Sequence, residues 1–149
     1  MRLFPRLPED VFIQVGDFVG VGIRHAARRR MQRATVVGMI GKLSKMADGR
    51  MMTHAAGSEV NMDLLAQIAR RAGAPEALAE RILAANTARH VLELTSAELP
   101  GFTTAICDLG VEQLQRHAAS AGTLSVHAVL VDFDGNVTGR SPPEIPEVS

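Results

Sequence analysis

The sequence predicts an α/β domain of three layers, with a mostly parallel sheet, a helical middle segment and a C-terminal strand or hairpin. Three observations predict this fold. Two apolar runs near the N-terminus each end in glycines and lead into a helical pattern, at 11–22 and 36–47. Helical periodicity dominates 58–120, and an apolar run at 124–133 closes the pattern. Strands that alternate with helices form parallel sheets covered by helices.

The first unit is a strand expected at 11–15, which breaks at Gly16 and Gly20 and leads into a helix through Met31. That helix ends in a run of arginines at 28–30. Cations in a last helical turn complement the helix dipole. We favour this role over contact with substrate carboxylates, because this helix end is expected at the opposite edge of the sheet from the glycine turns.

The second unit is a short β-branched strand that breaks at Gly38 and Gly41 and continues as a helix with Lys42 and Lys45. A strand that feeds a helix leaves backbone N–H groups uncovered, and an anion can dock there. The Walker P-loop is excluded, because only two residues separate the glycines and Leu43 follows the first lysine.

Two successive units of strand, glycine turn and helix predict parallel strands joined by a right-handed crossover. Both glycine turns then lie at the carboxyl ends of neighbouring strands, where open α/β sheets bind their ligands. We therefore expect Asp17 and Lys42 to face a common crevice. The spacing of Gly16, Gly20 and Gly22 does not match the dinucleotide-binding fingerprint.

The middle segment shows helix boundaries at capping and turn residues. An N-cap is expected within 58–61, Gly73 ends that helix, and Pro75 starts the next one in the first helical position. Thr87 is expected to cap a further helix. A longer helix is expected at about 103–120.

The C-terminal region contains the clearest strand, at 124–133. Its apolar centre predicts burial on both faces, as in a central strand. Asp134-Gly135 predicts a two-residue hairpin turn, after which 136–138 returns beside the strand. We expect one domain over 1–141 and a proline-rich, flexible tail at 142–149.

Composition excludes several classes of function. The 16 basic and 16 acidic residues balance, and the chain has no Trp or Tyr, so neither nucleic acid nor a membrane is an expected partner. The single Cys107 excludes an intrachain disulfide and favours a cytoplasmic location. We expect this thiol to be buried and inert. No protein-bound metal is expected, because the histidines lack ligand spacing with Cys107 or the acidic residues.

Four blocks of sequence occur in a specific order: 16–20, 38–47, Thr53-His54 and Asn86-Thr87. Together they resemble the C-terminal portion of the CbiD family, the cobalt-precorrin-5B (C1)-methyltransferases of anaerobic cobalamin biosynthesis. The resemblance extends from about Pro8 to Gly139. Family members are more than twice as long, so the resemblance implies a missing N-terminal half as a partner, in cis or in trans.

The resemblance implies methylation of ring carbon C1 of cobalt-precorrin-5B, which gives cobalt-precorrin-6A. The methyl donor is S-adenosylmethionine, and the tetrapyrrole substrate brings any cobalt. An alternative is that the chain is a non-catalytic ligand-binding or assembly domain, which needs the N-terminal half for activity.

The candidate binding residues come from the matched blocks: Gly16, Asp17, Gly20, Gly38, Gly41, Lys42, Lys45, Thr53, His54, Asn86 and Thr87. Asp17 either accompanies the donor's ribose or sulfonium or caps the following helix. Lys42, Lys45 and His54 are expected to meet substrate carboxylates. The glycines serve close ligand approach, tight turns of positive φ, or both. Asn86-Thr87 either contacts ligand or marks a helix break, and no catalytic residue is assigned.

Overall fold

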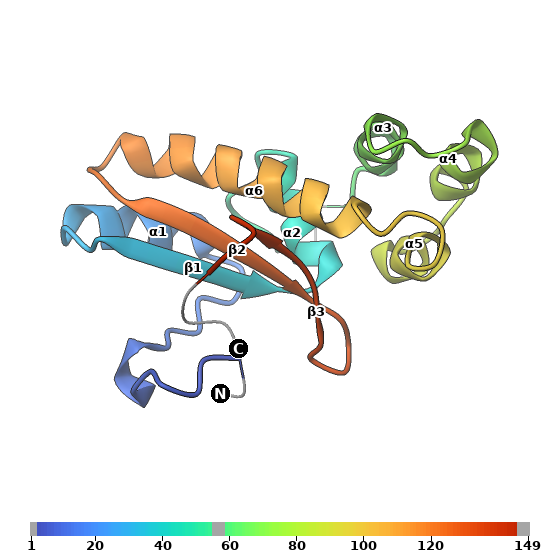
Figure 1. Ribbon diagram of the computed structural model, residues 1–149. Helices are drawn as coiled ribbons and strands as arrows, with labels where there is room; N and C mark the ends of the chain where they lie inside the picture. Colours follow the sequence, from blue (N-terminus) through green and yellow to red (C-terminus); the bar gives the residue numbers. More distant parts are fainter. Residues whose placement is uncertain (1–2, 55–58, 146–149) are drawn as a thin grey trace.

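The structure, a computed structural model, describes residues 3–54 and 59–145. Within these residues it contains six α-helices, a short 3-10 helix and a three-stranded sheet (Figure 1). The expected α/β class is confirmed, as is the C-terminal hairpin. Of the expected flexible tail, residues 146–149 lie outside the described part of the chain, whereas Ile145 is 3% exposed.

The sheet has the order β1-β2-β3. β1 (Arg33–Gly38) pairs in parallel with β2 (Ser125–Val131), and β3 (Val137–Ser141) pairs antiparallel with β2. The expected central strand is confirmed, since β2 lies between the other two. The sheet is mixed rather than mostly parallel, because the hairpin supplies one of its two strand pairs.

The hairpin turn is longer than predicted. The backbone N–H of Asp132 donates to the carbonyl of Asn136 at 2.9 Å, which places 133–135 in the turn. Gly135 has φ +84°. A left-handed glycine at this point is typical of three-residue hairpin loops, and the expected two-residue turn is therefore wrong.

The strand expected at 11–15 is wrong. A single 3-10 turn (Glu9–Val11) is followed by an extended segment that pairs with no described strand. Phe12 packs against Phe4 with ring centroids 5.9 Å apart, while Ile13 is 75% exposed. Alternating apolar residues indicate an extended chain but do not specify a strand partner. The parallel neighbour of β1 is consequently β2.

Helix α6 (Phe102–Ala119) lies along one face of the sheet (Figure 1). It contacts β2 and β3, and both α1 (Val19–Arg28) and α2 (Ile40–Ala47) pack against it. A three-layer arrangement is not confirmed, because these helices pack against one another beside the sheet. The N-terminal segment runs on the other side of the sheet (Figure 1).

Helices α3 (Met62–Arg71), α4 (Glu76–Leu83) and α5 (Ala88–Thr95) form a group beyond one end of the sheet (Figure 1). Asn61 accepts a hydrogen bond from the N–H of Leu64, and Thr87 accepts one from the N–H of His90. Both expected N-caps are thereby confirmed. Pro75 occupies the N-cap position of α4, one residue before the expected position.

In the described part of the chain, a cluster of buried apolar side chains joins the sheet to the helices. Its largest fully buried members come from every helix and from β2: Val19, Ile40, Leu43, Leu65, Leu78, Ile82, Val91, Phe102, Ile106, Leu114 and Leu130. Burying such a side chain contributes about 1.5–3 kcal/mol, so this cluster is the main source of stability. Among the described residues, no helix combines the length and apolar character needed to cross a membrane.

Candidate functional site

Two segments of chain, 16–21 before and within α1 and 50–54 after α2, lie side by side. The N–H of Gly20 donates to the carbonyl of Met51, and the N–H of Thr53 donates to the carbonyl of Asp17, each at 3.0 Å. We call this pair of backbone hydrogen bonds the seam. It places polar side chains on one side and a hollow on the other.

The polar cluster consists of Asp17, Lys42, Lys45 and Thr53. The ammonium of Lys42 donates to the Asp17 carboxylate, to Thr53 Oγ1 at 3.2 Å and to the Gly16 carbonyl at 3.3 Å. Lys45 Nζ donates to the Thr53 carbonyl at 3.3 Å. The two lysines are three residues apart in α2, which places them on one helix face.

The Asp17 carboxylate is held in its ionised form. The hydrogen bond from Lys42 lowers its pKa below the usual 3.8, and the charges of Lys42 and His54 act in the same direction, while burial opposes them. Asp17 does not cap α1, because Phe18 occupies the N-cap position and, within the described residues, no side chain caps that helix end. The side chain of Asp17 therefore fixes Lys42 instead.

The candidate glycines have different structural causes. Gly16 has φ +56°, the conformation that glycine adopts most readily. A Cβ on Gly20 would lie 2.6 Å from Met51 Cβ, and one on Gly38 would lie 2.7 Å from Leu43 Cδ2. Gly41 has no positive φ, and no atom of the described residues outside its own helical backbone lies within 4 Å of its would-be Cβ. The backbone conformation thus explains Gly16 and close contacts explain Gly20 and Gly38, whereas neither explains Gly41.

The contacts of Asn86 and Thr87 are separate from those of the polar cluster. Thr87 uses its side chain to cap α5, and among the described residues no hydrogen bond or ion pair joins Asn86 or Thr87 to the cluster. Both are exposed. The helix break accounts for Thr87, and the structure brings neither residue to the cluster.

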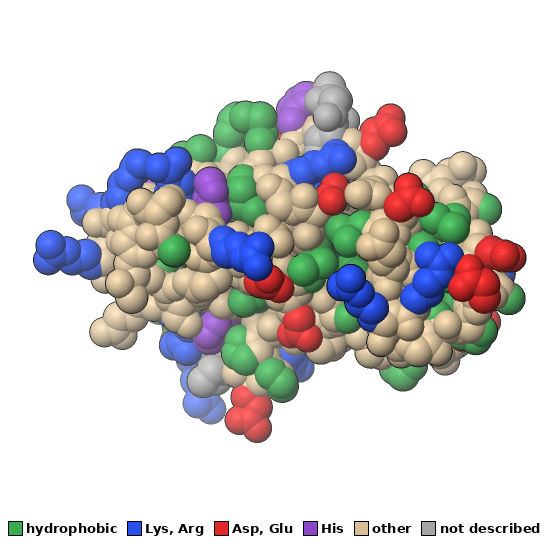
Figure 2. Space-filling view, turned by 90° about the horizontal axis from the view of Figure 1, so that it is seen from above, with side chains coloured by type: hydrophobic (Ala, Val, Ile, Leu, Met, Phe, Trp, Pro, Cys, Tyr) green, Lys and Arg blue, Asp and Glu red, His purple; other side chains and the backbone are tan. Residues whose placement is uncertain are grey.

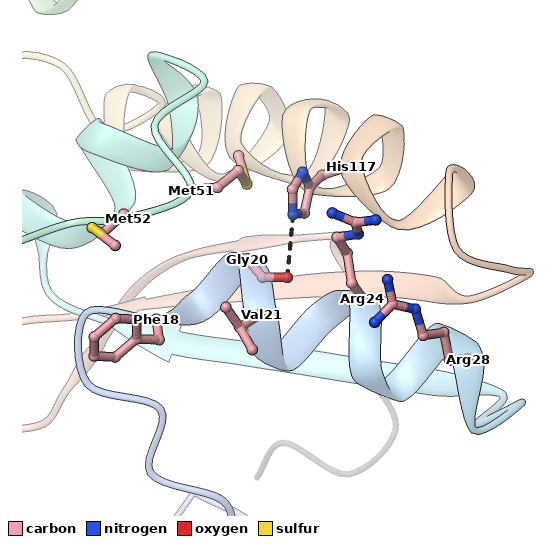
Figure 3. Close-up of a pocket in the computed structure, with 8 residues that line it drawn as sticks. All are labelled: Phe18, Gly20, Val21, Arg24, Arg28, Met51, Met52 and His117. Atoms are coloured by element: carbon pink, nitrogen blue, oxygen red, sulfur yellow. Dashed lines mark hydrogen bonds between the residues drawn. The ribbon is translucent and has the colours of Figure 1, made fainter.

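A hollow of about 240 Å³ opens on the other side of the seam. It lies between α1, the segment 51–52 and α6, and its lining residues are Phe18, Gly20, Val21, Arg24, Arg28, Met51, Met52 and His117 (Figure 3). His117 Nε2 lies 3.2 Å from the Gly20 carbonyl and spans the gap between α6 and α1 (Figure 3).

Sequence reasoning missed most of this hollow. Arg24 and Arg28 are four residues apart in α1, and that spacing puts two cations on one helix face. The sequence favours a helix-dipole role for the arginine run at 28–30 over contact with substrate carboxylates, whereas in the structure Arg28 also lines the hollow. His117 lies 97 residues from Gly20, and no local pattern connects them.

Cys107 belongs to the core rather than to a site. It is fully buried in α6, and burial raises the pKa of its thiol to about 12. The expected buried thiol is confirmed. In the described part of the chain, no group of three or more His, Cys, Asp or Glu residues is placed to hold a metal ion.

Comparison with known proteins identifies similar sequences. The family model for the CbiD C-terminal domain matches residues 52–142. A protein of Leptospira interrogans serovar copenhageni is 46% identical over 99% of this chain and 40% of its own length. A protein of Rubrobacter xylanophilus is 50% identical over 95% of this chain and 37% of its own length. Both are named cobalt-precorrin-5B C(1)-methyltransferase.

The chain therefore spans about 40% of the length of the curated relatives that it matches. A relative from Thermus thermophilus with the same name shows the same relation, at 49% identity over 89% of this chain and 36% of its own. No solved structure matches the chain.

Proposed function

The chain belongs to the family of CbiD C-terminal domains, and from this membership we propose that it is part of an enzyme that methylates C1 of cobalt-precorrin-5B. The supporting observation is that relatives 46–50% identical over nearly the whole chain carry this name. The reaction gives cobalt-precorrin-6A in anaerobic cobalamin biosynthesis, with S-adenosylmethionine as methyl donor.

We assign this chain the task of holding the anionic substrate. In the polar cluster, two ammonium groups, those of Lys42 and Lys45, accompany one carboxylate, that of Asp17. The Lys45 ammonium donates to a backbone carbonyl, and in the described residues no carboxylate neutralises it. Precorrins carry acetate and propionate side chains, which are suitable partners for such cations.

The polar cluster does not fit the cationic sulfonium of S-adenosylmethionine. Its single carboxylate, Asp17, already pairs with Lys42, and a sulfonium would have to compete with that ammonium. A second cation, Lys45, lies beside them. Like charges at short range repel, so we place the donor site outside this cluster.

Substrate orientation is then the contribution of this chain. Methyl transfer requires the donor carbon and the accepting carbon to be aligned, and fixed orientation can supply a large share of the rate. Lys42, held by Asp17 and Thr53, is positioned before substrate arrives. In this proposal His54, beside Thr53, adds a donor for a second carboxylate.

The experiment uses the full-length protein and measures binding of cobalt-precorrin-5B. We expect Lys42→Ala to weaken binding by about 1–3 kcal/mol, because it removes a charged hydrogen bond, while circular dichroism stays unchanged. Lys42→Arg should recover only part, since a guanidinium differs in shape from an ammonium. The control is Arg29→Ala, at the exposed C-terminal end of α1. Weakened binding in the control but not in Lys42→Ala would contradict the assignment.

The chain alone provides a second test. Because it spans about 40% of its relatives, we expect it to bind substrate without methyl transfer from radiolabelled donor. This result would favour a ligand-binding domain that requires the remainder of the protein. Sustained turnover by the chain alone would instead place the whole reaction within these 149 residues.

A further inference from the structure

The hollow beside the seam presents an unusual apolar rim. Phe18, Val21 and Met52 line it and are 55%, 67% and 59% exposed. Large apolar side chains that are exposed together mark binding sites more often than single exposed ones do. In Figure 3 they come from both sides of the seam, Phe18 and Val21 from one segment and Met52 from the other.

The second feature of the hollow is a pair of guanidinium groups. Arg24 and Arg28 both project from α1 towards it (Figure 3). Neither forms a hydrogen bond or ion pair with any described residue, and Arg24 Nε is buried without a partner among them. A buried donor that lacks an acceptor destabilises the fold, so an external acceptor would relieve a real penalty.

The remaining polar lining is also of donor type. His117 Nε2 faces a carbonyl, which only accepts, so this nitrogen carries a proton and donates to Gly20. Among the described residues, no Asp or Glu lines the hollow. On the face shown in Figure 2, basic side chains gather at the left end without acidic ones beside them, whereas the two mix at the right.

The size of the hollow limits what it encloses. Its volume of about 240 Å³ is below the roughly 300–1,000 Å³ of sites that enclose a drug-sized ligand. It has room for one arm of a larger molecule. Such an arm would carry an anionic group between the guanidiniums, and the body of the molecule would rest on the apolar rim.

We propose that the hollow binds the carboxylate arm of an apolar ligand through Arg24 and Arg28, with Phe18, Val21 and Met52 supporting the ligand's apolar body. Guanidinium groups bind carboxylates through paired hydrogen bonds, which gives direction as well as charge. That the ligand is a tetrapyrrole rests on the proposed function. The anion site itself rests only on the contacts of the hollow.

The test compares two cobalt corrins with the full chain. Cobyrinic acid carries free carboxylates, whereas cobinamide has the same ring with those groups as amides. We expect the chain to bind cobyrinic acid and to bind cobinamide at least about tenfold more weakly, because amides lack the charge that strengthens the guanidinium hydrogen bonds. Equal binding of the two corrins would overturn the proposal.

Substitutions locate the binding. Arg24→Gln and Arg28→Gln should each weaken cobyrinic acid binding about ten- to hundredfold, and Arg24→Lys should retain part of it. The matched control is Arg71→Gln, an exposed arginine in the last turn of α3. Thermal melting of each variant separates lost binding from lost folding. Binding unchanged in both Arg24→Gln and Arg28→Gln would overturn the proposal.

A simpler probe separates the proposed anion site from the assignment of a tetrapyrrole as its ligand. The apolar carboxylate 2-naphthoate, with 2-naphthamide as its uncharged control, should perturb the nuclear magnetic resonance signals of Phe18 and Met52 in the unsubstituted chain but not in Arg24→Gln. If this holds while cobyrinic acid does not bind, the anion site stands and the tetrapyrrole assignment fails. If only addition of the N-terminal part of the longer protein protects the hollow, a protein segment is the occupant and the proposal is wrong.

Discussion

Asp17 and Lys42 are 25 residues apart in the sequence, and in the structure they form an ion pair that joins the turn before α1 to the first turn of α2. Thr53 Oγ1 accepts from Lys42 and lies 3.4 Å from the Asp17 carboxylate. The sequence predicted that these two residues share a crevice. The prediction relied on two neighbouring parallel strands, whereas in the structure the seam brings the two residues together.

The ion pair makes stability depend on pH in the acid range. The folded-state pKa of Asp17 is lowered below its usual 3.8, chiefly by the hydrogen bond from Lys42. The stabilisation that the ion pair contributes is complete at pH values above the usual pKa of 3.8, and it is lost as the pH falls through the folded-state pKa. Between neutral pH and about pH 2.5, urea unfolding should show a smaller loss of stability for Asp17→Asn than for the unsubstituted chain.

The partner variant provides the control. Lys42→Met should flatten the same acid limb, and the double variant should add little to either single one, because all three lack the pair. The effect at neutral pH should be small, since the side chains are 41% and 34% exposed and water screens them. Parallel stability curves for the unsubstituted chain and Asp17→Asn would contradict the prediction.

Two glycine substitutions in helices should have opposite effects. Gly41→Ala should raise the free energy of unfolding by up to about 1 kcal/mol, because alanine favours helix and its Cβ meets no atom within 4 Å. Gly20→Ala should lower it by about 1–3 kcal/mol, because its Cβ would lie 2.6 Å from Met51 Cβ. Urea midpoints with unchanged m-values measure both, and a stabilised Gly20→Ala would refute the close contact.

Gly41→Ala also tests the expected close approach of a ligand. In the full-length protein, the variant should weaken substrate binding if ligand approaches the backbone at the start of α2. Stability and binding then change in opposite directions. The test is informative because the described contacts give Gly41 no other reason to be glycine. Unchanged binding would remove Gly41 from the site.

Thr87 should behave as a helix cap. Its side chain accepts from the N–H of His90 at 3.1 Å, so Thr87→Ala should cost about 0.5–2 kcal/mol of stability and Thr87→Ser should restore most of it. Chemical denaturation provides the measurement. Loss of substrate binding in Thr87→Ser, without loss of stability, would show a ligand contact instead.

The thiol of Cys107 should be unreactive in the folded chain. Burial raises its pKa to about 12, so almost no thiolate is present at pH 8 and reagent has no access to it. We expect the disulfide reagent DTNB to label it only as the chain unfolds, with the same midpoint in urea as circular dichroism. Fast labelling of the native chain would show that α6 opens locally.

Local signals in the sequence predicted the helices well. The side chains of Asn61 and Thr87 each accept a hydrogen bond from the backbone N–H three residues further along, and these capping bonds form as expected. The end of α1 was less predictable. The helix was expected to reach Met31 but ends at Arg28, because Arg30 adopts φ +60° and turns the chain towards β1.

Features that depend on distant parts of the chain were not predictable from local patterns. The extended segment at 11–15 has the alternation of a strand, yet β1 pairs with β2, about 90 residues further along. The hollow depends on His117 reaching Gly20 across 97 residues. Lys42 and Lys45 were recognisable because both lie in one helix, whereas the contacts of Thr53 with Lys42 and Asp17 depend on the seam.

The seam forms a common wall, because its backbone borders the hollow on one side and the polar cluster on the other. Met51 accepts from Gly20 on the side of the hollow, and two residues later Thr53 donates to Asp17 on the side of the lysines. A ligand that shifts this wall from one side changes the geometry on the other. Thermodynamic linkage then requires reciprocity: the factor by which an occupant of the hollow alters affinity at Lys42 equals the factor by which an anion at Lys42 alters affinity in the hollow.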